Sequence, residues 1–221
     1  MIERLRKLLG RGSSNENNKH LNYPRHEKPD AIILAAGMMG KKTLFPKALF
    51  EYGGKAIILH QISWLKPFVR KIIIACHKKE HESIANYLGA TEGIEFSLEE
   101  NLLGTAGAIK KALSKTKTNN IIIVNVDDMT DIDLNALIDF GPDTICIANP
   151  RLNFGLIETD GFDITQFREK PLIKDLWASC GVYLMSRKTL EKLPESGSLE
   201  QDVWPYTTLK AFKHFGIWKA F

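Results

Sequence analysis

The sequence predicts a three-layer α/β/α fold built on a mostly parallel sheet. Short apolar runs alternate with longer stretches that have helical spacing. Most of the apolar runs are continuous, as in strands that are buried on both faces. Glycine or proline follows several of the helical stretches at once. Together these observations indicate repeated β-α-β units, in which helices cover the faces of the sheet.

The individual elements follow from this alternation. The first strand, AIILAA, ends at Gly37, and the helical stretch after it stops at Pro67. The helical stretch before residue 144 stops at Gly141. We predict strands at 31–36, 71–76, 94–97, 121–126 and 144–149, and helices at 55–66, 81–88, 105–115 and 134–140.

The alternation of strands and helices ends at about Pro150. Short segments with β propensity follow, and the pair Asp160-Gly161 is typical of a hairpin turn. We expect antiparallel strands there and a further helical stretch at 198–212. The predicted domain therefore has a nucleotide-binding half (30–150) and a second half (151–221). Residues 1–29 are expected to form a short amphipathic helix and a flexible Gly/Ser/Asn-rich linker.

Composition excludes several classes of protein. A net charge of +4 and a pI of about 8.8 are mildly basic, whereas nucleic-acid binders cluster basic residues more strongly. No apolar run reaches the roughly 20 residues that a membrane helix needs. The three cysteines form no CxxC pair, so we expect buried thiols at Cys76 and Cys146 and a cytoplasmic protein. A homo-oligomer is left open.

A loop rich in small residues and lysines follows the first strand, in the segment LAAGMMGKKTLFPKAL (34–49). Small residues let backbone N–H groups approach phosphate oxygens, and Lys41, Lys42 and Lys47 could neutralise a triphosphate. The spacing matches neither the Walker loop nor the dinucleotide GxGxxG motif. An ordinary βα turn with solvated lysines is the alternative.

Six segments in order resemble the sugar-1-phosphate nucleotidyltransferase family, and in particular the catalytic domains of mannose-1-phosphate guanylyltransferases and glucose-1-phosphate thymidylyltransferases. The first is LAAG with PKAL and GGKAIILHQISWL. The others are FSLEENLLGTAGAIKKAL, NVDDMTDIDL, FREKP, SCGVYLM and SLEQDVWP. They span residues 31–205. The resemblance implies a Rossmann-like nucleotidyltransferase fold with a small antiparallel sugar-binding portion.

The resemblance also implies roles for individual residues. Lys41 and Lys47 would act on the phosphates, and Asp127 would be catalytic and bind Mg²⁺. A nucleoside triphosphate and a sugar 1-phosphate would be the substrates, giving a nucleotide-sugar and pyrophosphate. The nucleotide would lie on Leu34, Ala35, Ala36, Gly37, Glu100, Gly104 and Thr105, and the sugar phosphate on Glu169, Lys170 and Gly181.

Some positions depart from the family pattern. Met39 and Lys41 fall where the loop has Gly and Arg, and Ala220 falls where a second metal-binding Asp is expected. Asp128 or Glu200 could replace that Asp. These departures keep two alternatives open, namely a binding or regulatory protein without turnover and a nucleotidyltransferase for a non-sugar phosphate.

Other features have competing interpretations. Asp127-Asp128 could be the metal motif of a glycosyltransferase, although LGTAG and FREKP favour a nucleotidyltransferase. His77 and His81 have a spacing that can bind metal on a helix, but the segment HKKEH reads more simply as a solvated face. The four tryptophans are expected to be core or interface anchors.

Overall fold

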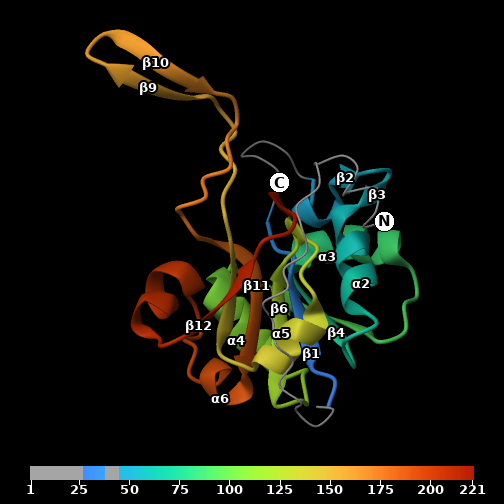
Figure 1. The fold of residues 1–221 in the computed structure, drawn as a ribbon. Coiled ribbons are helices and arrows are strands. Elements are labelled where there is room, and N and C mark those ends of the chain that lie inside the picture. Colours follow the sequence, from blue (N-terminus) through green and yellow to red (C-terminus); the bar gives the residue numbers. More distant parts are fainter. Residues whose placement is uncertain (1–26, 38–44) are drawn as a thin grey trace.

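The computed structural model describes residues 27–37 and 45–221. Its centre is a seven-stranded sheet in the order β12-β8-β11-β6-β1-β4-β5 (Figure 1). All neighbouring strands are parallel except β11, which is antiparallel to both β6 and β8. The strands are β1 (Asp30–Leu34), β4 (Ile72–His77), β5 (Ile94–Glu99), β6 (Asn120–Asn125), β8 (Thr144–Ala148), β11 (Ala178–Ser186) and β12 (Lys210–His214).

The central strands are apolar throughout because both of their faces are buried. Along β1, Ile32 packs into one core and Ile33 into the other. The helices α2 (Ile57–Leu65), α3 (Lys78–Leu88) and α5 (Leu134–Phe140) contribute to the core on the Ile33 side. On the Ile32 side lie α4 (Gly104–Leu113) and α6 (Arg187–Leu190). The predicted three-layer α/β/α fold is therefore confirmed.

Two predicted elements are wrong in part. The segment 198–212 is helical only in the turns Leu199–Val203 and Trp204–Tyr206, because Lys210–His214 forms the edge strand β12 and buries Phe212. Helix α3 begins at Lys78 rather than residue 81. His77 caps it, with its Nδ1 accepting from the Lys79 N–H at 3.0 Å while Glu80 accepts from the His77 N–H at 3.1 Å.

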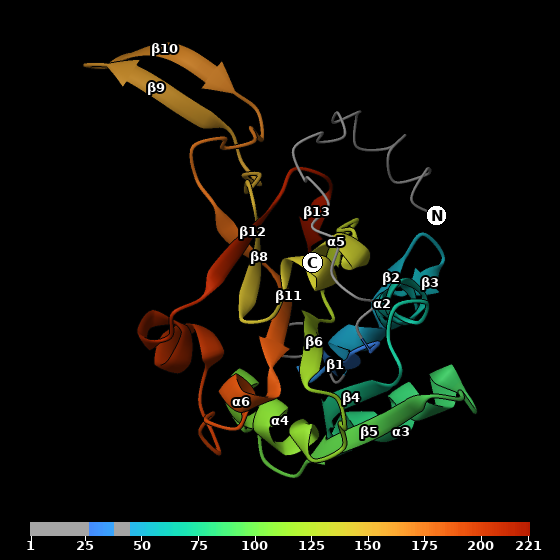
Figure 2. The same ribbon diagram turned by 60° about the horizontal axis from the view of Figure 1, so that its bottom comes forward.

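The second half of the chain shares the sheet of the first, since β11 lies between β6 and β8. The predicted antiparallel strands also occur outside this sheet, as a hairpin of β9 (Leu156–Asp160) and β10 (Asp163–Arg168) with Gly161 in its turn. Figures 1 and 2 both show this hairpin standing away from the body.

Two further strand pairs lie near the ends of the sheet strands. One joins β2 (Glu51–Tyr52) to β3 (Lys55–Ala56). The other joins β7 (Asp128–Thr130) to β13 (Trp218–Ala220), which brings the end of the chain beside Asp128. The predicted N-terminal helix and most of its linker lie outside the described residues. In the part of the chain that the structure describes, no helix is long and apolar enough to cross a membrane.

Candidate active site

A lysine and an aspartate meet at the carboxyl ends of β1 and β6. Asp127 follows β6, and its Oδ2 forms an ion pair with Lys47 Nζ. The two side chains are 19% and 29% exposed, so the pair is open to solvent. Ligands of open α/β sheets collect at this edge. Two of the three residues predicted to be catalytic thus lie in contact.

The backbone before this pair is held in place by buried groups. Val126 N–H donates to Leu34 O at 3.1 Å, and Ala35 N–H donates to Ala75 O at 2.8 Å. Lys47 N–H donates to Gly37 O at 3.0 Å, so the two ends of the intervening segment lie together. Lys41, with the rest of 38–44, lies outside the described residues.

Glu80 holds the backbone at Gly37 through a hydrogen bond, and the sequence alone did not single out this residue. Its Oε1 accepts from the Gly37 N–H at 3.0 Å, while its Oε2 caps helix α3. The side chain is buried, and burial raises the pKa of its carboxyl, although the two backbone donors act in the opposite direction. The capping-box spacing from His77 to Glu80 was the signal available in the sequence.

Asp128 is buried beneath Asp127 and has both oxygens engaged. Trp218 Nε1 donates to its Oδ1 at 2.8 Å, and Asn125 Nδ2 donates to its Oδ2 at 3.0 Å. Burial raises the pKa of the Asp128 carboxyl, and these two donors lower it. Gln61 holds the surrounding backbone by donating to Asp128 O at 2.7 Å. Asp128 therefore ties β7 to Trp218 and Asn125 through both of its oxygens.

Gly181, predicted to contact the sugar, lies directly against Asp128. A Cβ at this position would be 2.1 Å from Asp128 Oδ2, and the backbone has φ +69°. Only glycine fits both conditions without a shift of its neighbours. The close approach of β11 to Asp128 therefore accounts for the glycine without any substrate.

The C-terminal strand places Ala220 beside Asp128, its partner in the β13–β7 pair. Phe221 N–H donates to Asp127 O at 3.1 Å. The methyl of Ala220 offers no metal ligand. Glu200 Oε2 accepts hydrogen bonds from Thr105 Oγ1 at 3.1 Å and from Ser198 Oγ at 2.9 Å. Within residues 27–37 and 45–221, no group of three or more His, Cys, Asp or Glu side chains could hold a metal. Asp127, at 19% exposed, is a carboxylate at this edge that a ligand could reach.

The last residue of β5, Glu99, and the next residue, Glu100, differ in burial. Glu100, predicted to flank the base, is exposed and lies 3.5 Å from Lys78 Nζ. Glu99 is buried, and its Oε2 accepts from the Leu103 N–H at 2.9 Å. Its Oε1 is buried without a hydrogen-bond partner. Glu99, and not Glu100, has the spacing from Ser97 that the family pattern SxE requires. The contact of Glu100 with the base stays a prediction.

Gly104 and Thr105 dock helix α4 onto the segment 197–200. A Cβ at Gly104 would be 2.3 Å from Gly197 O. Thr105 Oγ1 accepts from the Leu199 N–H at 2.8 Å and donates to Glu200 Oε2 at 3.1 Å. Two segments of the family pattern therefore interlock with each other.

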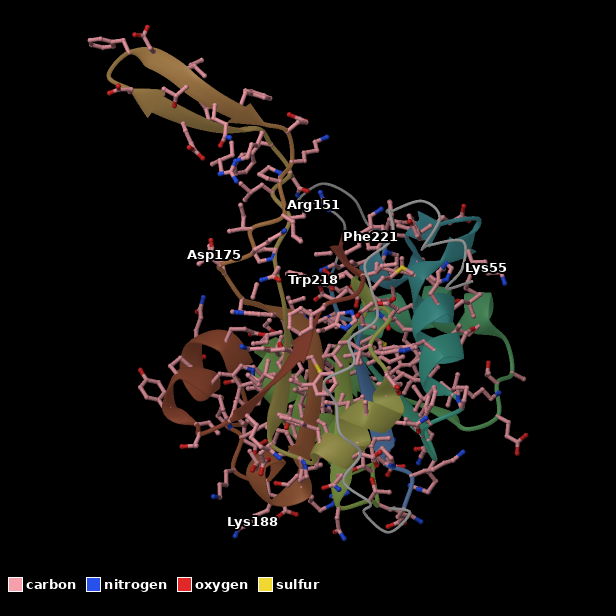
Figure 3. All side chains as sticks on the ribbon, in the orientation of Figure 1. Lys55, Arg151, Asp175, Lys188, Trp218 and Phe221 are labelled. Carbon is pink, nitrogen blue, oxygen red and sulfur yellow. The ribbon has the colours of Figure 1, made fainter. Side chains whose placement is uncertain are left out.

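Glu169 and Lys170 lie on the stem of the hairpin, 3.8 Å apart and exposed. Arg151 Nη1 donates to Lys170 O at 3.0 Å across the stem. Figure 3 shows Arg151 at the same end of the molecule as Phe221, with Lys188 at the opposite end. Arg151 is hydrogen-bonded to Lys170 and Phe221 to Asp127, so Glu169 and Lys170 lie at the same end of the molecule as Asp127. The side chains of Glu169 and Lys170 pair with each other.

The remaining candidates have structural roles. His81 packs edge-on against Phe96, with ring centroids 4.6 Å apart, so HKKEH is not simply a solvated face. The three cysteines are buried and unpaired, and burial raises the pKa of the Cys76 and Cys180 thiols to about 12. Trp64 donates to Ile132 O at 3.3 Å, which agrees with an anchoring role.

Fold and site together define the class as an open α/β protein with a lysine–carboxylate pair at the edge where such proteins bind nucleotides. Residues 31–203 match the nucleotidyl transferase family model. The chain is 32% identical over 192 residues to a D-glycero-alpha-D-manno-heptose 1-phosphate guanylyltransferase of Aneurinibacillus thermoaerophilus, covering 78% of this chain and 82% of the relative. A Campylobacter jejuni protein of the same name is 30% identical, with 82% and 88% covered.

Among solved structures, HddC of Yersinia pseudotuberculosis superposes with a TM-score of 0.69 at 25% identity. The match covers 87% of this chain and 93% of HddC. The chain belongs to the nucleotidyl transferase family, among the sugar-phosphate nucleotidyltransferases. The family resemblance and the fold drawn from it are thus confirmed.

Proposed function

We propose that this protein transfers a guanylyl group from GTP to a sugar 1-phosphate. The observation that carries this proposal is the Lys47–Asp127 pair, exposed at the carboxyl edge of the sheet in a chain of this family. The names of the two bacterial relatives support GTP as the donor and a heptose 1-phosphate as the first acceptor to test.

In the proposed reaction, a phosphate oxygen of the sugar 1-phosphate attacks the α-phosphorus of the nucleotide. The bond from that phosphorus to the bridging oxygen breaks, and pyrophosphate leaves with the electron pair. A phosphate monoester is ionised at neutral pH, so no general base is required. Positioning and charge neutralisation would supply the rate enhancement.

Lys47 would exchange partners during this reaction. Its ammonium now pairs with Asp127, and a bound triphosphate would offer it more negative charge. Asp127 would then be free to hold Mg²⁺, which proteins commonly bind through one or two carboxylates together with substrate phosphates. The bound ion would act as a Lewis acid on the phosphoryl oxygens.

We further propose that Glu99 selects guanine, after the side chains that cover it in this structure have moved aside. A buried carboxylate oxygen without a partner is stabilised by any donor that reaches it. Guanine offers two donors on one edge, its N1–H and its N2 amino group, whereas uracil and thymine offer one. The neighbouring Leu102 is 72% exposed and could cover the apolar face of a base.

The test is pyrophosphate release by the purified protein with Mg²⁺, each common nucleoside triphosphate and a panel of sugar 1-phosphates. We expect release with GTP and one class of sugar phosphate, and none after Asp127→Ala. Absence of release with every pair would overturn the proposal.

The two glutamates give a matched test of base choice. We expect Glu99→Gln to lower kcat/KM for GTP by roughly tenfold. The amide has one acceptor oxygen where the carboxylate has two, so one of the two hydrogen bonds from guanine would be lost. Glu100→Gln changes the adjacent, exposed carboxyl and should leave kcat/KM within about twofold. An equal effect of both substitutions would remove Glu99 from base recognition.

A second candidate function is nucleotide binding without turnover. Ala220 motivates it, because this residue carries no oxygen where the family pattern has an aspartate. Calorimetry with GTP that shows binding, together with silence in the pyrophosphate assay, would favour this candidate.

A further inference from the structure

The β9–β10 hairpin exposes large apolar side chains that no other part of residues 27–37 and 45–221 covers. Phe162 is 106% exposed, Ile164 64% and Phe167 61%. Among the described residues, the two strands pair with each other and with no third strand. Figures 1 and 2 show the hairpin apart from the body in both views. Isolated two-stranded hairpins are marginally stable in water, and exposed apolar patches mark interaction sites. We therefore expect another surface to pack against this hairpin.

The hairpin has one apolar face and one polar face. Phe167 is paired with Ile157, and Ile164 with Thr159, so these four residues share a face. The register shift between Ile164 and Gln166 inserts Thr165 as an extra residue, which puts Ile164 and Phe167 on the same side. The opposite face carries the ion pair of Arg168 with Glu158, at 2.8 Å. We call the side of Ile157, Thr159, Ile164 and Phe167 the apolar arm face.

The sequence of β10 can pair with a second copy of itself so that opposite charges face each other and apolar residues face each other. When two copies of DITQFR run antiparallel about a twofold axis, Asp163 of each lies opposite Arg168 of the other. Ile164 lies opposite Phe167 in the same arrangement. Strand β9 lacks this property, because its central Glu158 would face the same carboxylate in the second copy.

We propose that the β9–β10 hairpin is a dimerisation arm that binds the same hairpin of a second copy of this chain. Strand β10 meets its twofold equivalent, and the apolar arm faces of both copies become covered together. The opposite charges at the ends of β10 set the antiparallel register. A different protein, or the body of the same chain, is the alternative occupant.

Oligomeric state in solution tests the proposal. Sedimentation velocity over a range of concentrations should show a dimer for the intact chain. Ile164→Asp combined with Phe167→Asp should raise the dimer dissociation constant by about thirtyfold or more, since it places charge in the centre of the interface. Tyr206→Asp alters another exposed aromatic, 86% exposed and remote from the hairpin, and should leave the dimer unchanged. A monomeric intact chain, or a dimer that is unaffected by the hairpin substitutions, overturns the proposal.

Charge exchange tests the twofold register itself. Asp163→Arg alone sets arginine against arginine, and Arg168→Asp alone sets aspartate against aspartate. Each variant should dimerise about tenfold more weakly than the intact chain. An equimolar mixture of the two variants restores both opposite-charge pairs and should form a heterodimer close to the intact affinity. Failure of the mixture to associate more tightly than either variant alone contradicts the register.

Discussion

The carboxyl edge of the sheet and the hairpin stem hold the two halves of the predicted site in different ways. At the edge, Asp127 projects from a buried strand end, with Asp128 engaged beneath it by Trp218 and Asn125. On the stem, Glu169 and Lys170 are exposed and held by few contacts. The predicted nucleotide half is therefore built into the core, whereas the predicted sugar-phosphate residues lie at the base of the projecting hairpin. A fold can keep its phosphate chemistry constant on the first and vary its acceptor on the second.

The largest expected difference between the two regions is catalytic. Asp127→Asn should lower kcat by roughly 10³-fold, because it removes the charge of the carboxylate that pairs with Lys47. Lys170→Met should leave kcat nearly unchanged and raise KM for the sugar phosphate by roughly tenfold. Steady-state kinetics with each substrate varied in turn separates the two. Equal losses of kcat would show that both regions act on the transferred group.

The next difference between the body and the hairpin is the cost in stability of replacing a glycine with positive φ. Gly181→Ala should destabilise the fold by about 3 kcal/mol, because its Cβ would overlap Asp128 Oδ2 in a left-handed backbone conformation. Gly161→Ala has a similar φ of +60° but nothing within 4 Å of its Cβ, so about 1 kcal/mol is expected. Urea unfolding measures both. A larger loss at Gly161 would contradict the contrast between body and arm.

The smallest expected effect is the pH dependence of stability. Burial raises the pKa of Asp128 in the folded state, so the native protein binds a proton there more readily than the unfolded chain does. This contribution is fully present below the unfolded pKa of Asp and is lost as pH rises through the folded pKa. Asp127 strengthens the shift, and Lys47 weakens it.

Asp128→Asn should remove that contribution and flatten the stability profile above about pH 4. Asp133→Asn makes the same substitution at an exposed helix cap and is the control for the loss of a carboxyl group elsewhere in the fold. Denaturant midpoints taken across pH check both variants. An unchanged slope in Asp128→Asn would mean that the titration belongs to another group, such as the buried Glu80.

Prediction from sequence succeeded where the signal was local. The continuous apolar runs predicted five sheet strands, and LAAG, PKAL and FREKP indicated the family. Prediction failed at 198–212, where helical spacing gave way to pairing with β8, a strand more than 60 residues earlier. The sequence also does not show that Glu99 is buried while Glu100 is exposed, since adjacent residues differ only in the direction that the strand gives their side chains.

By itself, the sequence determined the layered fold, the family and the residues available for phosphate chemistry, because each is written in short segments with their own periodicity or motif. Only the tertiary structure decided how these segments meet. It set Ala220 beside Asp128, joined Thr105 to Leu199 by a hydrogen bond, and left the apolar arm face uncovered by the other described residues. Contacts of this kind depend on chain segments far apart in sequence, so their outcome follows from packing and hydrogen bonding in the folded state.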